Sequence, residues 1–170
     1  RQTTARLPWL LIGMIGGIGN SMILGNFDST FAAHPEMALY IPLIGGTGGN
    51  VGTQSSAIVV QGLANSSLDA KNTFKQVTKE AVVALINATI ISLLVYTYNF
   101  IRFGATATVT YSVSISLFAV VMFASIFGTL VPMTLENLKI DPAIATGPFI
   151  AITNDIIGMM MYMGITVLLS

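Results

Sequence analysis

Five long apolar segments, separated by short polar connections, constrain the fold of this chain more than any motif does. Each is long enough to cross a bilayer, since a transmembrane helix needs about 20 residues. Backbone polar groups in lipid must be satisfied within the protein, so a spanning segment of this kind is helical. The chain is therefore expected to be an all-α integral membrane protein, with residues 1–170 forming one domain of five transmembrane helices at residues 7–27, 36–63, 80–101, 109–134 and 143–169.

The composition supports a membrane protein and excludes several functional classes. The chain is 54% hydrophobic and 8% charged, with a mean hydropathy of +0.79, whereas soluble domains carry about 25% charged residues. The formal net charge is zero, which argues against a nucleic-acid partner. The absence of cysteine excludes disulfides and thiolate metal sites, and one histidine cannot form a histidine metal cluster.

Asp155 is the candidate functional carboxylate, because it lies alone in the middle of the last apolar segment. A carboxylate at that depth costs roughly 2.5 kcal/mol or more unless it is paired or hydrated. No Lys or Arg lies within any of the other predicted spans, so a cation from solution is the expected partner. The alternative is a hydrogen bond inside the bundle, to Asn50 or Thr53.

A glycine-rich segment at residues 41–56 lies in the second predicted span. Five glycines in eight positions form a poor helix by propensity, and irregular backbone in a membrane is tolerated inside protein or beside water. Polar side chains follow at once. We interpret this segment as pore-lining, through Gly49, Asn50 and Thr53. Close helix packing through GxxxG pairs is the alternative, and it also explains the glycines.

A stripe of small residues leads up to Asp155 in the last span. Gly147, Ala151 and Asp155 are spaced four apart, so they are expected on one face of a helix. That face would leave room above the carboxylate and keep the Ala151 carbonyl reachable. Residues expected to continue or flank the stripe are Gly158, Asn154 and Thr146. Asn20 and Asn87, in the first and third spans, are interpreted as interhelical hydrogen-bonding residues.

The candidate ligands are carboxylate, amide, hydroxyl and carbonyl oxygens, which favour a hard cation. One carboxylate per chain is too few for a dehydrated Ca²⁺ or Mg²⁺ cage, but Mg²⁺ retains its waters and suits a wide, weakly charged site. In a two-fold dimer, two Asp155 carboxylates about 8 Å apart would repel by roughly 2 kcal/mol at an effective dielectric near 20. A divalent cation between them reverses the sign of that interaction.

The distribution of Lys and Arg predicts the orientation in the membrane. Five spans place the two termini on opposite sides. With a cytoplasmic N-terminus the outside segments hold Arg102 alone, and the inside segments hold Arg1, Arg6, Lys71, Lys75, Lys79 and Lys139. This asymmetry follows the positive-inside rule. We therefore expect a multi-pass protein of the cell membrane with the N-terminus cytoplasmic and the C-terminus outside.

Two long motifs resemble the signatures of the MgtE family of magnesium channels. PLIGGTGGNVGTQS (residues 42–55) resembles the signature of the family's second helix, and DPAIATGPFIAITND (residues 141–155) resembles the signature that leads into its fifth helix. The start RLPWLL (residues 6–11) is similar to the beginning of the family's first helix. The resemblance covers nearly the whole chain in the right order.

The resemblance implies a homodimer with its pore on the dimer axis, lined by the second and fifth helices. It places Asp155 of both subunits around a hydrated Mg²⁺, with the Ala151 backbone facing the ion's waters and Asn50 in the Gly-Gly-Asn motif. Some members have Asn at the level of Gly147, and Asn154 flanks the site. Full-length members carry a cytosolic N-domain and CBS domains before the first helix. Nothing resembling them occurs in residues 1–170, so separate or missing regulatory domains are expected.

The expected function is that of a Mg²⁺-selective divalent cation channel and not an enzyme, with Mn²⁺, Co²⁺ or Ca²⁺ open as further transported ions. The first alternative is a Na⁺-coupled or other secondary Mg²⁺ transporter. Five spans do not divide into two equal repeats, which argues mildly for a channel. The less favoured alternative is an intramembrane aspartyl protease, in which two Asp155 side chains would share a proton.

Overall fold

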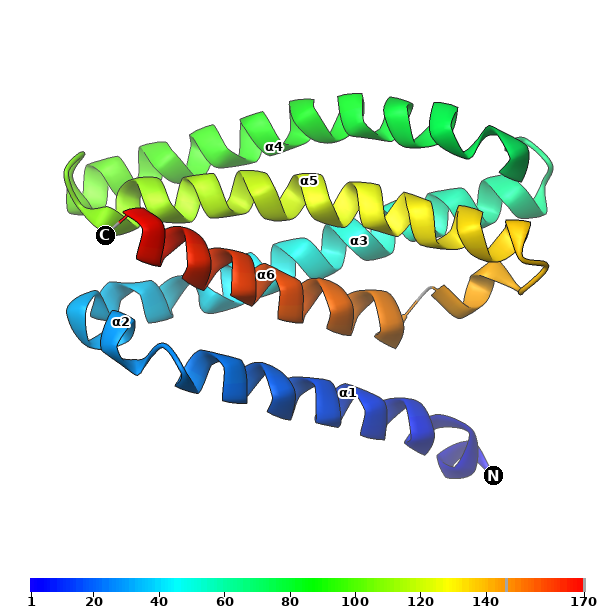
Figure 1. Ribbon diagram of the computed structural model, residues 1–170, viewed down its shortest axis with the longest axis horizontal. Helices are drawn as coiled ribbons and strands as arrows, with labels where there is room; N and C mark the ends of the chain where they lie inside the picture. The colour runs from blue at the N-terminus through cyan, green and yellow to red at the C-terminus, as the bar shows by residue number, and fades with distance from the viewer. Residues whose placement is uncertain (146, 170) are drawn as a thin grey trace.

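The protein is a bundle of long helices (Figure 1), seen in a computed structural model that describes residues 1–145 and 147–169. No β-strand occurs among these residues. The long helices are α1 (Gln2–Gly25), α3 (Ile41–Ala64), α4 (Thr73–Phe103), α5 (Thr108–Asn137) and α6 (Pro148–Leu169). The connections contain the short helix α2 (Asp28–Ala33) and the 3-10 helices η1 (Pro35–Tyr40), η2 (Ala70–Asn72) and η3 (Pro142–Ala145).

The long helices run along one axis of the molecule and reverse direction from each to the next (Figure 1). The N-terminus and the last turn of α6 consequently lie at opposite ends of the bundle. α5 lies beside α4 and α6 and also packs against α3, so it forms the centre of the bundle. α1 packs mainly against α6 and is the least enclosed helix, with Asn20 as its buried residue.

Among the described residues, four helical stretches are long and apolar enough to cross a membrane: α1, α5, α6 and the stretch Ala70–Phe103 that contains α4. α3 is as long as α1, at 24 residues, but it is not among these four candidates. Its glycines and polar side chains lower its mean hydropathy. The four apolar stretches support a membrane protein. Hydropathy alone does not support the span that the sequence predicted at residues 36–63, which contains most of α3.

The glycine-rich segment is a continuous α-helix despite its poor helix propensity. Propensity is overridden by packing, since one side of α3 is buried against α5 and α6. A methyl group on Gly128 of α5 would lie 2.6 Å from the Gly52 carbonyl oxygen, which shows how closely the two helices approach. The GxxxG interpretation is therefore correct for the buried side of α3, which includes Gly48 and Gly52.

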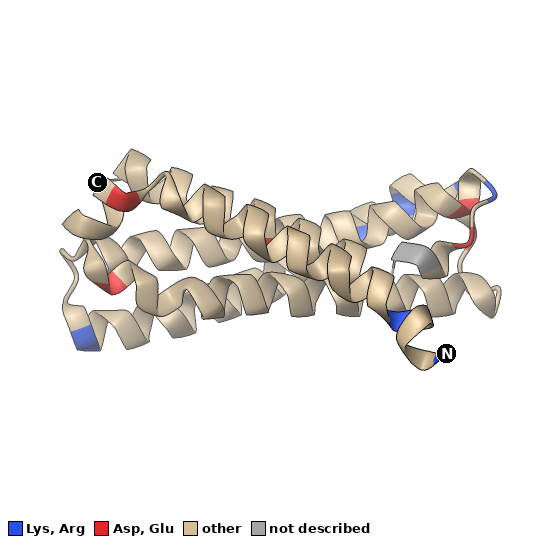
Figure 2. Ribbon diagram, turned by 90° about the horizontal axis from the view of Figure 1, so that it is seen from below, with Lys and Arg blue, Asp and Glu red and all other residues tan. Residues whose placement is uncertain are grey.

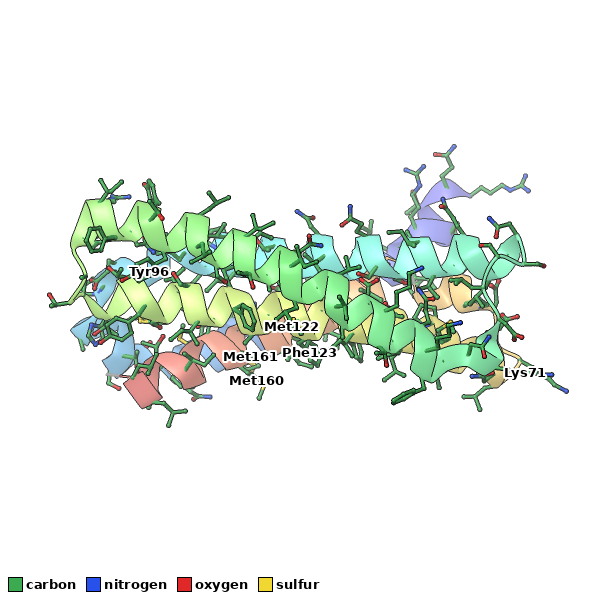
Figure 3. All side chains as sticks on the ribbon, turned by 90° about the horizontal axis from the view of Figure 1, so that it is seen from above. Lys71, Tyr96, Met122, Phe123, Met160 and Met161 are labelled. Atoms are coloured by element: carbon green, nitrogen blue, oxygen red, sulfur yellow. The ribbon has the colours of Figure 1, made fainter. Side chains whose placement is uncertain are left out.

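An apolar core fills the end of the bundle near η1. Its largest fully buried members come from η1, α3, α5 and α6: Met37, Ile44, Leu117, Met159, Tyr162 and Met163. The Tyr162 hydroxyl donates to the Met37 carbonyl at 2.8 Å, and the Tyr40 hydroxyl donates to Asn99. These bonds satisfy polar atoms that burial would otherwise penalise. Figure 3 shows Met160 and Met161 of α6 in the same part of the view as Met122 and Phe123 of α5.

The last long helix begins later than expected. The sequence predicted a span from residue 143, whereas η3 ends at Ala145 and α6 begins at Pro148. Asp141 Oδ1 accepts a hydrogen bond from the Ala143 amide at 3.0 Å, so Asp141 caps the short η3 helix. Gly147 has a φ of 103°, a backbone conformation that favours glycine and is incompatible with an α-helix. The chain therefore turns at Gly147 before α6 begins.

Apart from Asp155 within α6, the charged residues lie mainly toward the two ends of the bundle (Figure 2). The end at which α1 begins also contains the α3–α4 and α5–η3 connections, and so it carries Lys71, Lys75 and Lys139. Figure 3 shows Lys71 at this end and Tyr96 towards the other. The opposite end has Arg102, in the last turn of α4. The helix directions thus separate Arg102 from the other basic residues, as the sequence predicted.

Candidate ion site

A cleft of about 640 Å³ opens between α1, α3 and α6. It is lined almost entirely by glycine, small polar side chains and one carboxylate, so its walls are mostly backbone. Large apolar side chains are nearly absent, which distinguishes the cleft from the apolar core. The residues that line it are Gly13, Gly16, Gly17, Gly45, Gly46, Gly49, Asn50, Thr53, Gln54, Ala57, Ala151, Ile152 and Asp155.

Among the described residues that line this cleft, Asp155 is the one that carries a charge. Its Oδ2 atom accepts a hydrogen bond from Asn20 Nδ2 at 3.2 Å, which joins α6 to α1. Its Oδ1 atom lies over Gly45 of α3, because a methyl group built on Gly45 would lie 2.5 Å from that oxygen. The carboxylate therefore lies between the Asn20 amide, which donates to it, and Gly45 of α3, which has no side chain. It remains partly exposed to the cleft.

The structure brings together most of the residues that the sequence selected. Gly49, Asn50 and Thr53 of α3 line the same cleft as Asp155, and Ala151 lies one turn before the carboxylate on α6. An added methyl group on Gly49 would meet no atom within 4 Å, so this glycine faces open space. The expected alternative partners of Asp155 were Asn50 and Thr53, whereas the bonded partner is Asn20.

Two of the selected residues lie elsewhere. Gly147 precedes α6 and does not line the cleft; its carbonyl accepts the Ala151 amide hydrogen bond at 3.1 Å, so it begins the helix. Asn154 is 1% exposed and packs against Gly52 of α3, inside the bundle. Both Asn154 amide atoms lack a hydrogen-bond partner among the described residues. Thr146 lies outside the described residues, and Gly158 faces Val120 and Ile44 rather than the cleft.

Sequence reasoning did not identify the contribution of α1 to the site. Asn20 was interpreted as a general hydrogen-bonding residue, and the glycines at 13, 16 and 17 were not singled out. These four positions share one helical face, spaced three or four apart, and a sequence signal was therefore present. Gly16 lies against the Ile152 side chain, so its lack of a side chain allows α1 to approach α6.

The site cannot enclose a dehydrated metal ion within one chain. No group of three or more His, Cys, Asp or Glu side chains gathers anywhere in the described part of the chain. The cleft offers one carboxylate together with amide, hydroxyl and backbone oxygens. Such a set can contact a hard cation through the ion's own waters, because Mg²⁺ usually retains several of them.

Comparison with known proteins identifies the family. The model of the MgtE family, described as a divalent cation transporter, matches residues 41–165. This chain belongs to the MgtE family. The matched region contains Asp155 and the whole cleft-lining side of α3, and the family is one of transporters rather than enzymes. The aspartyl protease interpretation is therefore wrong.

Curated relatives of this MgtE-family chain are named magnesium transporters. It is 32% identical to Magnesium transporter MgtE of Bacillus subtilis over 94% of this chain and 35% of the relative. It is also 32% identical to Magnesium transporter MgtE of Thermus thermophilus over 97% of this chain and 36% of that protein. The chain thus spans about a third of the length of these relatives.

Proposed function

We propose that this chain forms the pore of a Mg²⁺-selective channel of the cell membrane, as a homodimer of five-helix protomers. Two copies would place their clefts face to face across a two-fold axis, and a hydrated Mg²⁺ would pass between the two Asp155 carboxylates. The names of the relatives supply the ion, Mg²⁺. The position of Asp155 in an open, glycine-walled cleft is the observation that carries the proposal.

The exposed polar side of α3 supports the dimer. Asn50, Thr53 and Gln54 are exposed on α3, at a depth where lipid would leave their polar groups without partners. A second copy with water on the axis would solvate them. The same argument makes α3 the fifth transmembrane span. Its low hydropathy is acceptable because its polar side faces a water-filled pore and its other side is buried in the bundle.

The expected spacing of the paired carboxylates follows from the hydration of the ion. Mg²⁺ holds its waters at about 2.1 Å, and each water can donate to a carboxylate over about 2.7 Å. Two carboxylate oxygens on opposite sides of the ion would therefore be about 10 Å apart. Glycine and alanine along the walls leave the width that this requires. Contact through water also keeps binding weak enough for release, as conduction needs.

Magnesium flux into liposomes tests the function. Asp155→Asn preserves shape and removes the charge, so we expect it to lower Mg²⁺ flux by about tenfold or more, a loss of at least about 1.4 kcal/mol of ion binding. Asp141→Asn is the matched control, because Asp141 is exposed and caps a connection outside the cleft. Wild-type flux through Asp155→Asn would contradict the proposal.

The same liposomes distinguish the channel from a coupled carrier. A channel conducts Mg²⁺ down its gradient when Na⁺ is replaced on both sides by a large organic cation. Flux that requires a Na⁺ gradient would favour the secondary transporter instead. Competition by Mn²⁺, Co²⁺ and Ca²⁺ in this assay measures the selectivity, and Mg²⁺ is expected to be preferred.

The proposed orientation places the N-terminus in the cytoplasm and the C-terminus outside. It is supported by the segregation of basic residues at the end where α1 begins. The chain has no cysteine, so Lys71→Cys provides a single thiol at that end. A membrane-impermeant thiol reagent is expected to label it only after the cells are opened, whereas Thr106→Cys, between α4 and α5, should be labelled in intact cells. The reverse pattern would invert the topology.

A further inference from the structure

A second polar groove lies on the other side of α3, between α3, α4 and α5, with a volume of about 360 Å³. Its polar lining consists of Gln54 and Ser55 from α3, Glu80 and Asn87 from α4, and Ser125 from α5. The remaining lining residues are aliphatic. Gln54 also lines the Asp155 cleft, so one side chain separates the two spaces. The proposed channel mechanism does not use this groove.

Glu80 gives the groove a single negative charge, since no other lining residue is charged. Its Oε1 atom accepts a hydrogen bond from Ser55 Oγ at 2.9 Å, which fixes the carboxylate against α3. The nearby lysines do not neutralise it within the groove, because Lys75 and Lys79 line a separate hollow with Asp69. The charge is therefore positioned by a neutral donor and lacks a cationic side chain among the groove's own residues.

The depth of the groove favours a polar occupant. The apolar part of α4 follows Glu80, and Asn87 lies seven residues further along, about 10 Å deeper at 1.5 Å per residue. Asn87 is exposed, and an amide facing lipid at that depth would lack hydrogen-bond partners. Glu80 itself lies near the Lys-rich end of the bundle, so ions in water can reach the groove from that end.

We propose that this groove is a binding site for a monovalent metal cation, Na⁺ or K⁺, held by the Glu80 carboxylate and by oxygens of Ser55, Ser125 and Gln54, with Asn87 contacting the ion through its waters. The single negative charge of the Glu80 carboxylate balances a cation of charge +1, and the four neutral side chains supply further oxygen atoms. A divalent ion there would leave an excess positive charge at the edge of the bilayer. The site shares α3 and Gln54 with the Asp155 cleft. It differs from the cleft in its charged residue, in its other helices (α4 and α5) and in the ion that we propose it binds.

Thermal unfolding of the full chain in detergent, without Mg²⁺, tests the site. NaCl or KCl replaces N-methyl-D-glucamine chloride at constant ionic strength. A ligand that binds the folded state raises the Tm with its concentration, so we expect a saturable rise for the wild type. The rise should vanish in Glu80→Gln and persist in Asp155→Asn, which separates this site from the proposed channel site. Glu136→Gln, an exposed acid outside the groove, is the matched control and should behave as wild type.

A second variant keeps the test decisive if Glu80→Gln does not fold. Asn87→Ala removes one water-mediated contact at an exposed position and should shift the NaCl or KCl titration to higher concentration. The proposal is overturned by the absence of a saturable rise in the wild type, or by an equal rise in the Glu80 variant. It is also overturned if only MgCl₂ gives a Glu80-dependent rise, or if the Tm responds to pH and not to either salt.

Discussion

The two sides of α3 are built from the same glycine-rich sequence but have different structural roles. On one side, Gly48 and Gly52 are buried, and an added methyl group would meet Val120 at 2.8 Å or the side chains of Ile150 and Asn154. On the other side, Gly46 and Gly49 have no atom within 4 Å of an added methyl group. The buried glycines permit close packing, whereas the open glycines create the width of the cleft.

This difference makes the two interpretations of the glycine-rich segment compatible. Packing applies to the buried side of α3, and the proposed pore lining applies to the opposite side, which lines the cleft. Both GxxxG pairs occur in the sequence, but Gly45–Gly49 lies along the cleft and Gly48–Gly52 lies in the bundle. Gly45 has a third role, because its missing side chain leaves room for the Asp155 carboxylate.

Valine substitutions on the two sides of α3 should differ in their effect on stability. Gly52→Val would overpack α3 against α6 and is expected to lower stability by about 1–3 kcal/mol or more. Gly49→Val should leave the Tm near wild type, since its side chain enters open space, and should lower Mg²⁺ flux by narrowing the cleft. The measurements are thermal unfolding in detergent and flux in liposomes. Equal loss of stability in both variants would remove the distinction between the two sides.

A smaller effect is expected from the residue that orients the carboxylate. Asn20→Ala removes the hydrogen bond to Asp155, and hydrogen bonds to charged groups contribute about 1.5–3 kcal/mol. Part of this should be recovered by water in the cleft, so we expect Mg²⁺ flux or affinity to fall by about tenfold or less. Ser21→Ala, at an exposed neighbouring position on α1, is the control. Identical flux in both variants would show that Asn20 serves packing alone.

The sequence predicted the main features of the fold because lipid imposes simple rules. The length of the apolar segments and the scarcity of charge within them predicted the positions of the long helices. The isolation of its carboxylate singled out Asp155, which lines the cleft. α4 begins at Thr73, so Lys75 and Lys79 lie in its first turns, before its apolar part. Four-residue spacing correctly placed Ala151 and Asp155 on one face, since both line the cleft.

The features that the sequence missed depend on contacts between helices. Propensity suggested a loosened α3, but burial against α5 and α6 holds it helical. The four-residue spacing predicted Gly147 on the same helical face as Asp155, but Gly147 has a positive φ and lies just before α6. Asn20 could not be assigned to Asp155 because the two residues are 135 positions apart, and only the packing of α1 on α6 brings them together.

The central claim is that the cleft beside α3 is half of a pore that a second copy completes. Pulsed EPR on the reconstituted protein tests this directly, with a single spin label introduced through Thr53→Cys on the cleft side or Leu94→Cys on the exposed side of α4. The account predicts a dipolar coupling between two copies, with a clearly shorter distance between labels at position 53 than at position 94. A shorter distance at position 94, or no coupling at position 53, would contradict it.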